Sequence, residues 1–234
     1  MNATRAPARH LQPGHSRGLF EVFNQRYLLQ LIVRKELRAR YYGSVLGLLW
    51  SYVKPAVQFA VFYFAIGVFL GMNRSMDNYA VYLFSGIVVV NYFSEILGNA
   101  TRSIVGNAPL VKKIYLPREL FPVSSVFVAA VHLWPQLIVL WIGSLISGWH
   151  PTLLEVLALP VAILICTLFA LGLGLLFGSI NVIYRDAENL VDLILMVASW
   201  ASPVLYTWTQ VVHVFPAKWF YPIYSLNPLT PAVD

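Results

Sequence analysis

The chain has 234 residues, of which 59% are hydrophobic and only 11% are charged, and its formal net charge is +6. A soluble globular domain usually carries about 25% charged residues, so the composition excludes a soluble fold of this size. It also excludes a disordered chain, which would lack this much apolar surface, and a nucleic-acid-binding domain, which would need a basic groove in water.

Long stretches without Asp, Glu, Lys or Arg predict membrane-spanning helices. A helix needs about 20 mainly apolar residues to cross the hydrocarbon core of a bilayer. An outer-membrane barrel is excluded, because its strands alternate apolar and polar residues. The sequence therefore predicts an all-α fold, a polytopic helical membrane protein. The charge-free stretches have 19, 17, 35, 29 and 25 residues and lie at 55–73, 78–94, 120–154, 156–184 and 193–217.

The region before these stretches divides into two parts. Residues 1–18 are polar and basic and contain no apolar run, so they are no cleavable signal peptide and we expect a mobile basic tail. Residues 19–43 are expected to form an amphipathic helix in the membrane interface, with Lys and Arg among the lipid headgroups. A cytosolic helix packed on a partner is the alternative. The apolar residues that predict this helix recur every three or four positions: Phe20, Phe23, Tyr27 and Leu31.

Residues 44–234 are expected to form one transmembrane domain. Thirteen Lys and Arg fall on the side of the N-terminus and two on the opposite side, so the positive-inside rule places the N-terminus in the cytoplasm. Prolines in 210–234 break any continuous helix there, and this segment is predicted to lie outside. The five predicted spans are 45–70, 80–98, 123–147, 153–178 and 191–209.

The sequence indicates no catalytic, cofactor or metal site. It contains no phosphate-binding loop of the form GxxxxGK followed by Ser or Thr, so the chain is not expected to hydrolyse nucleotide by that route. No cluster of His, Cys and Asp has metal-ligand spacing, and the only cysteine, Cys166, lies in an apolar stretch. Ala170, Gly174 and Gly178 form a face of small residues spaced by four, which favours close helix packing.

Ionisable side chains within spans are candidates for function, because burying them in a bilayer is costly. Glu95 lies late in the second predicted span and Lys54 about two turns into the first, so an ion pair between them is one hypothesis. His132 stands alone in the third span and is expected to be a hydrogen-bonded helix contact rather than a proton carrier. Asp192 lies at a helix end, where we expect it to be solvated or to cap the helix.

Aromatic residues are abundant, with 7 Trp, 13 Tyr and 14 Phe. Most fit interfacial belts and core packing. A phenol away from the interface needs a polar partner, either across helices or in a polar channel. Sugar rings have apolar C–H faces and many hydroxyls. A sugar chain could therefore move along an aromatic wall that contains phenols without being bound strongly. Ordinary helix packing is the alternative for each of these phenols. The candidates for lining the channel are three tyrosines: Tyr63, Tyr82 and Tyr92.

Four blocks of sequence resemble the permeases of polysaccharide-exporting type-2 ABC transporters, which move O-antigen, teichoic acid and capsule chains. The blocks are 34–55 (RKELRARYYGSVLGLLWSYVKP), 109–122 (PLVKKIYLPRELFP), 184–206 (YRDAENLVDLILMVASWASPVLY) and 226–231 (LNPLTP). They resemble, in that order, the family's approach to the first span, its first cytoplasmic loop, its second cytoplasmic loop with the fifth helix, and the extracellular stretch before its last helix. Because family members have six spans, this chain is expected to lack the last one.

The resemblance implies a permease of the bacterial cytoplasmic (inner) membrane that is not itself an enzyme. It implies a homodimer that associates with membrane lipid, a lipid-linked polysaccharide and two separate ABC ATPase subunits. ATP and Mg are expected on those subunits, and no cofactor in this chain. The implied contact with the ATPase lies in the first cytoplasmic loop: Leu110, Val111, Lys112, Lys113, Ile114, Tyr115, Leu116, Arg118 and Glu119.

A basic cluster just before the first span is expected to contact the pyrophosphate of the lipid-linked substrate, because Arg favours bidentate phosphate contacts. Topological anchoring alone is the alternative for these residues: Arg34, Lys35, Arg38 and Arg40.

Three other functions are alternatives. An ABC permease for drugs or lipids would have the same topology. A secondary transporter would usually show several intramembrane charges and broken helices. A membrane-embedded transferase would need convergent acids, histidines or a metal.

Overall fold

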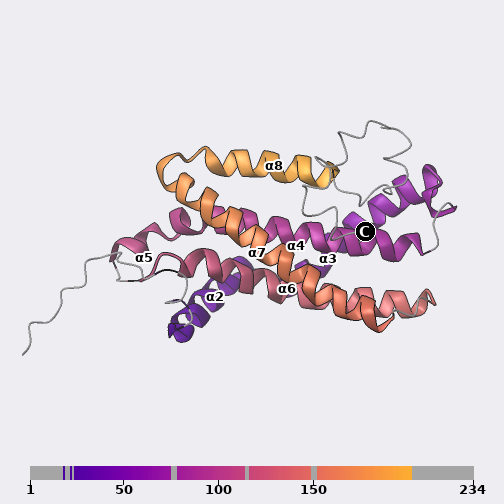
Figure 1. Cartoon of the computed structure of the whole chain (residues 1–234), viewed down its shortest axis with the longest axis horizontal. Helices are drawn as coiled ribbons and strands as arrows, with labels where there is room; N and C mark the ends of the chain where they lie inside the picture. The colour runs from indigo at the N-terminus through magenta and orange to yellow at the C-terminus, as the bar shows by residue number, and fades with distance from the viewer. Residues whose placement is uncertain are drawn as a thin grey trace, which may run out of the picture.

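The computed structural model of the chain describes residues 18, 22, 24–74, 78–113, 116–148 and 152–201. Within these residues every regular element is a helix, and the long helices run roughly side by side in an elongated bundle (Figure 1). The predicted all-α fold is confirmed. Most of the predicted basic tail and the segment 202–234 lie outside the described residues.

The first part of the bundle is formed by α2 (Arg26–Tyr41) and by a helical stretch that changes its winding. That stretch begins as a 3-10 turn, η1 (Gly47–Leu49), continues as α3 (Trp50–Phe62) and ends as a π-helix, η2 (Tyr63–Phe69). A further 3-10 turn, η3, covers Met72–Arg74.

The second part contains three long helices and two shorter ones. They are α4 (Tyr79–Gly106), α5 (Ala108–Lys113), α6 (Leu120–Ile146), α7 (Leu153–Ile183) and α8 (Ala187–Ala201).

Four helical stretches among the described residues are long and apolar enough to cross a membrane, and each overlaps one of the first four predicted spans. The fifth predicted span, 191–209, overlaps α8 as far as Ala201, and the rest of it lies outside the described residues. The four stretches are Gly47–Phe69, Tyr79–Gly106, Leu120–Ile146 and Val156–Ile183.

The second predicted span ends too early. We expected it to end at residue 98, with a loop from 99 to 122, but α4 continues to Gly106. The reason is packing: Ala100 and Thr101 are fully buried, so the residues that follow Gly98 still belong to the helix interface. The fourth span likewise runs to Ile183 instead of 178.

Helix α4 lies at the centre of the bundle and packs against both α6 and α7. Its side chains Leu83, Ile96 and Leu97 are fully buried in the main hydrophobic core. The face of small residues on α7 packs against it, as predicted. A Cβ added to Gly174 would lie 2.6 Å from the Cβ of Ala100, so only glycine permits this approach of the two helices.

Helix α2 packs on α6 through a second cluster, and its buried face differs from the predicted one. Leu28, Leu29 and Ile32 pack toward Leu120 and Phe121, the first two residues of α6. By contrast, Tyr27 is 72% exposed and Leu31 is 43% exposed. The helix carries apolar residues on more than one side, and the aliphatic side is the one that binds α6. The other predicted apolar residues, Phe20 and Phe23, lie outside the described residues.

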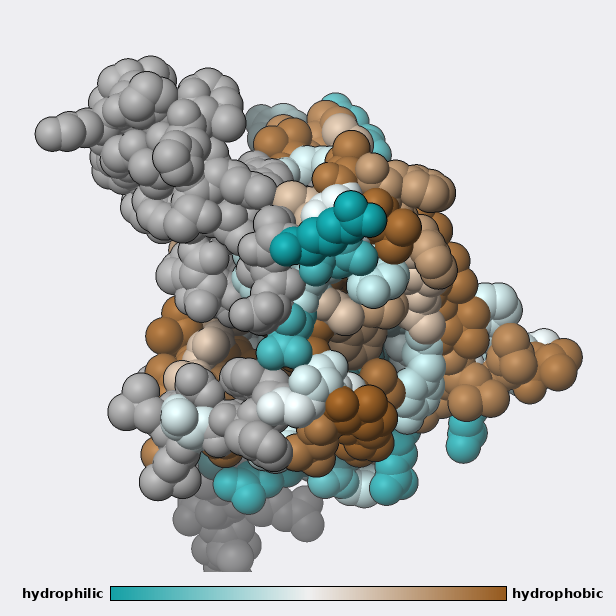
Figure 2. Space-filling view, turned by 90° about the vertical axis from the view of Figure 1, so that its right-hand side faces the viewer, coloured by the Kyte–Doolittle hydropathy of each residue, from teal (hydrophilic) through white to brown (hydrophobic). Residues whose placement is uncertain are grey.

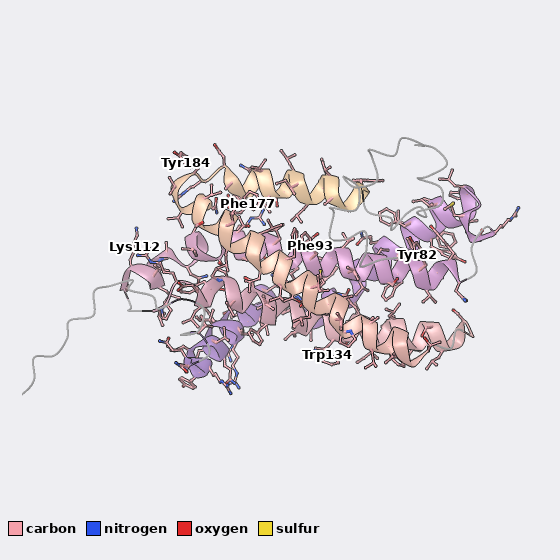
Figure 3. The ribbon with its side chains drawn as sticks, viewed as in Figure 1. Tyr82, Phe93, Lys112, Trp134, Phe177 and Tyr184 are labelled. Carbon is pink, nitrogen blue, oxygen red and sulfur yellow. The ribbon has the colours of Figure 1, made fainter. Side chains whose placement is uncertain are left out.

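The side chains labelled in Figure 3 mark the two ends of the long axis. Lys112 of α5 and Tyr184, in the turn before α8, lie at one end, and Tyr82 lies near the other (Figure 3). Viewed along that axis from the end near Tyr82, hydrophobic residues cover much of the surface that is not grey (Figure 2). The two loops predicted on the cytoplasmic side, which contain Lys112 and Tyr184, therefore lie at the same end of the molecule.

Candidate functional site

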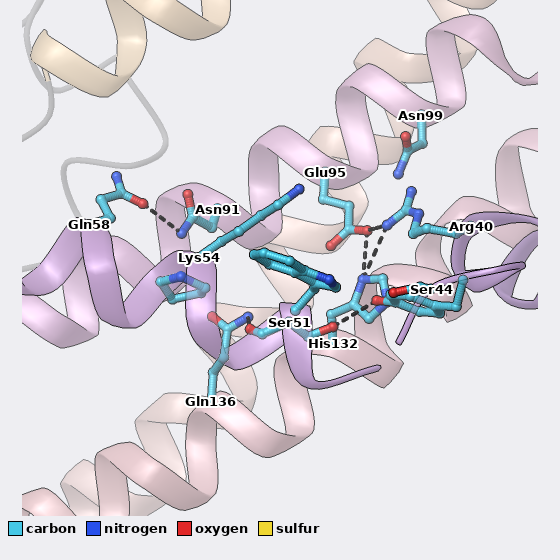
Figure 4. A pocket seen from close by; sticks show the side chains of 13 residues that line it. Arg40, Ser44, Ser51, Lys54, Gln58, Asn91, Glu95, Asn99, His132 and Gln136 are labelled. Carbon is cyan, nitrogen blue, oxygen red and sulfur yellow. Dashed lines mark hydrogen bonds and ion pairs between the residues drawn. The ribbon is translucent and has the colours of Figure 1, made fainter. Parts of the chain in front are cut away.

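A cavity of about 690 Å³ lies where the end of α2 meets α3, α4 and α6 (Figure 4). We call it the polar cavity, because ten of its 13 lining residues carry a charged, amide or hydroxyl group. Polar groups are costly within membrane-spanning helices, so their convergence marks a candidate functional site. The lining residues are Arg40, Tyr41, Ser44, Trp50, Ser51, Lys54, Pro55, Gln58, Asn91, Glu95, Asn99, His132 and Gln136.

Glu95 is the centre of a hydrogen-bonded network in this cavity. Its Oε1 atom forms an ion pair with Arg40 and lies 2.7 Å from Nδ1 of His132. Nε2 of His132 lies 2.9 Å from the hydroxyl of Tyr41, which in turn lies 2.8 Å from Oγ of Ser51. The acceptor at Glu95 assigns the Nδ1 proton of His132 to that bond. The network therefore joins α2, α3, α4 and α6.

This network tests two hypotheses that were based on the sequence. The prediction of His132 as a hydrogen-bonded helix contact is confirmed. The hypothesis that Lys54 pairs with Glu95 is wrong, since among the described residues the ion pairs of Glu95 are with Arg40 and His132. Lys54 lines the same cavity but takes part in no ion pair within the described part of the chain.

Proline explains how Gln136 is positioned. Pro55 lies inside α3 and has no backbone N–H, so the carbonyl of Ser51 lacks its usual helical donor. The Nε2 atom of Gln136, from α6, donates to that carbonyl at 3.4 Å. This contact leaves Oε1 of Gln136 buried without a hydrogen-bond partner among the described residues.

Two further amide side chains, those of Asn91 and Gln58, form a hydrogen bond in the same wall. The Nδ2 atom of Asn91 donates to Oε1 of Gln58 at 3.1 Å, joining α4 to α3. Sequence reasoning missed these amides because only charged and aromatic side chains were considered as intramembrane candidates. Amide side chains within charge-free stretches are the signal that would have found them.

None of the predicted channel-lining tyrosines lines the polar cavity. Tyr92 is buried between α4 and α7, where its hydroxyl lies 2.8 Å from Oγ1 of Thr167. Tyr63 is half-buried and stacks on Phe59 with a ring distance of 5.6 Å. Tyr82 is half-buried near the opposite end of α4.

The basic cluster predicted to contact lipid phosphate divides into two pairs. Arg40 is engaged by Glu95, and Lys35 binds the Oδ1 atom of Asn107 and forms an ion pair with Glu36 at 3.2 Å. Arg34 and Arg38 are exposed on α2.

The predicted ATPase-coupling segment is also divided. Leu110, Val111 and Leu116 are partly buried in the cluster that joins α2 to α6. Lys112, Lys113 and Arg118 are exposed, and Glu119 is half-buried. Ile114 and Tyr115 lie outside the described residues.

We expected Asp192 to be solvated or to cap a helix end, but it lies within α8, six residues into the helix. It forms an ion pair with Arg102, whose Nε also lies 3.8 Å from Glu188. These contacts join α4 to α8 at the end of the molecule that carries Lys112. Among the described residues, no three His, Cys, Asp or Glu side chains are grouped so that they could hold a metal ion.

Comparisons with known proteins assign the family. A Klebsiella pneumoniae protein named O-antigen export system permease protein RfbA is 30% identical over 210 residues, which cover 88% of this chain and 78% of that protein. A protein of the same name from Myxococcus xanthus is 31% identical over 186 residues, covering 80% and 70%. The polysialic acid transport protein KpsM of Escherichia coli is 24% identical over 230 residues, covering 94% and 82%. Residues 27–234 match the family described as ABC-2 type transporter, so the chain belongs to this family of transporter membrane proteins.

Proposed function

We propose that the chain is the permease of an ATP-driven exporter that moves a lipid-linked polysaccharide across the bacterial cytoplasmic membrane. The observation that carries this proposal is the polar cavity within the membrane-spanning helices of an ABC-2 type protein. Relatives named for O-antigen export and polysialic acid transport support a polysaccharide as the substrate.

In this proposal the chain does not hydrolyse ATP. Hydrolysis takes place on two copies of a separate ABC ATPase, which bind ATP and Mg, and the permease is a homodimer. The span that contains α3 is little covered by the rest of the chain, since only 11% of its most apolar stretch is buried, the same share as for the span Val156–Ile183 in α7 and against 50% for α4. Because α3 also carries five residues of the cavity wall, a second copy beside it would complete that side of the cavity.

The N-terminus lies in the cytoplasm in this proposal. The excess of Lys and Arg on that side supports the orientation. It also places α5 and the turn before α8 where a cytoplasmic ATPase can bind them. Lys112, Lys113 and Arg118 then contact the ATPase through their charges, while Leu110 and Val111 hold α5 against the bundle.

Substrate contacts follow from the same orientation. Arg34 and Arg38, exposed on α2, contact the pyrophosphate of the lipid carrier at the membrane surface. Tyr63 in η2 and Tyr82 in α4, both half-buried, line the path farther from the cytoplasm.

Deletion of the gene in its host tests this function. We expect polysaccharide to disappear from the cell surface and lipid-linked polysaccharide to accumulate inside, with both effects reversed by a plasmid copy. The measurement is surface labelling of glycan in whole cells against total glycan in lysed cells. Unchanged surface glycan in the deletion strain would rule the proposal out.

A further inference from the structure

We propose that the polar cavity is a sugar-binding subsite, which holds one sugar ring of the exported chain inside the membrane-spanning part of the permease. The inference rests on the proposed function and adds to it a specific site with named contacts. Its volume of about 690 Å³ lies within the range of small-molecule sites, about 300–1,000 Å³, and is sufficient for a sugar ring.

The first argument is an unused acceptor. Gln136 is only 8% exposed, and its Oε1 atom has no partner among the described residues. A buried polar atom without a partner is unfavourable unless water or a ligand supplies one. The Nε2 atom of the same amide is held by the carbonyl of Ser51, and almost none of the surface of Oε1 is accessible. A sugar hydroxyl therefore reaches this acceptor only when the amide side chain moves slightly toward the cavity.

The second argument is that the cavity wall contains both donors and acceptors. The pair of Gln58 and Asn91 uses one donor and one acceptor, and within the described part of the chain it leaves Nε2 of Gln58 and Oδ1 of Asn91 available. Lys54 adds an ammonium group that forms no ion pair among the described residues. A sugar hydroxyl both donates and accepts hydrogen bonds, so a ring with several hydroxyls matches such a wall.

Other ligand classes match it less well. A bare phosphate needs donors on all sides, but the wall contains the carboxylate of Glu95 and the acceptor of Gln136. A metal or organic cation would meet the ammonium of Lys54. A purely apolar ligand would leave all of these groups without partners, at a cost for each.

The third argument is the aromatic side chain in the same wall. Trp50 lines the cavity beside Lys54 and Ser51, and 41% of its surface is exposed. A flat aromatic face accommodates the C–H side of a sugar ring, while the amides bind the hydroxyls at its edge. Polar groups at fixed positions beside an apolar wall are typical of small-molecule sites.

A photocrosslinking experiment in the intact export system tests the subsite. Trp50→p-benzoyl-phenylalanine places a photoreactive aromatic group in the cavity of cells that produce the native lipid-linked polysaccharide. After irradiation the permease is purified under denaturing conditions and probed with a periodate-based carbohydrate stain. We expect a glycan-bearing adduct that depends on light and that disappears when synthesis of the polysaccharide is blocked.

The matched control carries the same photoreactive residue at Phe127, which is 47% exposed on α6 and lies outside the polar cavity. We expect no glycan adduct there. Equal adducts at both positions, or none at position 50 in cells that still export, would overturn the subsite. The second result would mean that the cavity holds water only.

A second set of variants tests the subsite without the probe. Lys54→Met and Gln136→Met keep the side-chain length but remove the donor and the acceptor, and each is expected to lower the export rate about two- to tenfold, as for one lost hydrogen bond. Lys54→Arg keeps a donor and should retain most of the rate. Wild-type export by both Met variants, at normal membrane levels, would overturn the subsite. The function itself is tested separately, by whether deletion of the gene abolishes export.

Discussion

The carboxylate of Glu95 on α4 lies 2.7 Å from Nδ1 of His132 on α6 and forms an ion pair with Arg40 at the end of α2. One carboxylate thus holds together three segments that are more than 30 residues apart in sequence. In a chain with so few charges, this arrangement satisfies Glu95 and Arg40 at the same time.

Replacing Glu95 with Leu should destabilise the permease by about 1.5–3 kcal/mol, the usual range for a hydrogen bond to a charged group. The loss leaves Arg40 and His132 without their acceptor. The measurement is the free energy of unfolding of the wild type and the variants, obtained by denaturant titration in detergent. The double variant Glu95→Leu/Arg40→Leu should lose less than the sum of the two single variants, because the second change removes the unpaired charge. Strict additivity would show that the two residues do not interact.

The contact between α4 and α7 makes a sharper prediction. Gly174→Ala places a Cβ at 2.6 Å from that of Ala100, which forces the two helices apart, and should cost about 1–3 kcal/mol. Ala100→Gly in the same chain should restore most of the stability. The control is Gly172→Ala, whose added Cβ meets nothing within 4 Å and should be neutral or slightly stabilising. Thermal unfolding of the purified permease ranks the three variants against the wild type, and an equally destabilised Gly172→Ala would contradict this account.

The contact between Gln136 and the Ser51 carbonyl can be tested through the proline that creates it. Gln136→Met leaves that carbonyl without a donor and should destabilise the protein by about 1 kcal/mol, since the bond is long. Adding Pro55→Ala supplies a helical N–H to the same carbonyl, so the double variant should recover stability but not export. If the double variant recovered both stability and export, Gln136 would have no role in substrate binding.

Charge at the α5 end should control association with the ATPase. Lys112→Ala/Lys113→Ala should slow association several-fold at low salt and have less effect at high salt, because exposed charges act mainly on the association rate. Binding kinetics of the purified permease with its ATPase measure this directly. Arg74→Ala is the control, since Arg74 is exposed beyond the opposite end of α3 and should change nothing. An equal effect of Arg74→Ala would point to net charge rather than to α5.

The fold followed closely from the sequence because a bilayer imposes strict conditions on composition. Charge-free stretches located the four described spans, and the spacing of Gly174 and Gly178 predicted the tight helix contact. The end of α4 was misplaced because Asn99 and Arg102 have the composition of a loop, whereas packing against α7 and the ion pair with Asp192 keep the segment helical.

The site was less accessible to sequence reasoning. Arg40, Glu95 and His132 were each identified as notable residues, but their partners were not, because spacing within one helix does not determine which faces of separate helices meet. The role of Gln136 depends on Pro55 in another helix, and no local pattern links positions 55 and 136.

Helix α4 has one mechanical consequence. Glu95 in the polar cavity and Arg102 in the contact with α8 are seven residues apart on the same unbroken helix, or about 10 Å along its axis. An α-helix over that distance moves as a rigid rod. A tilt applied through Asp192 at the end of the molecule therefore displaces the cavity wall at Glu95 in the same motion, without any intervening hinge.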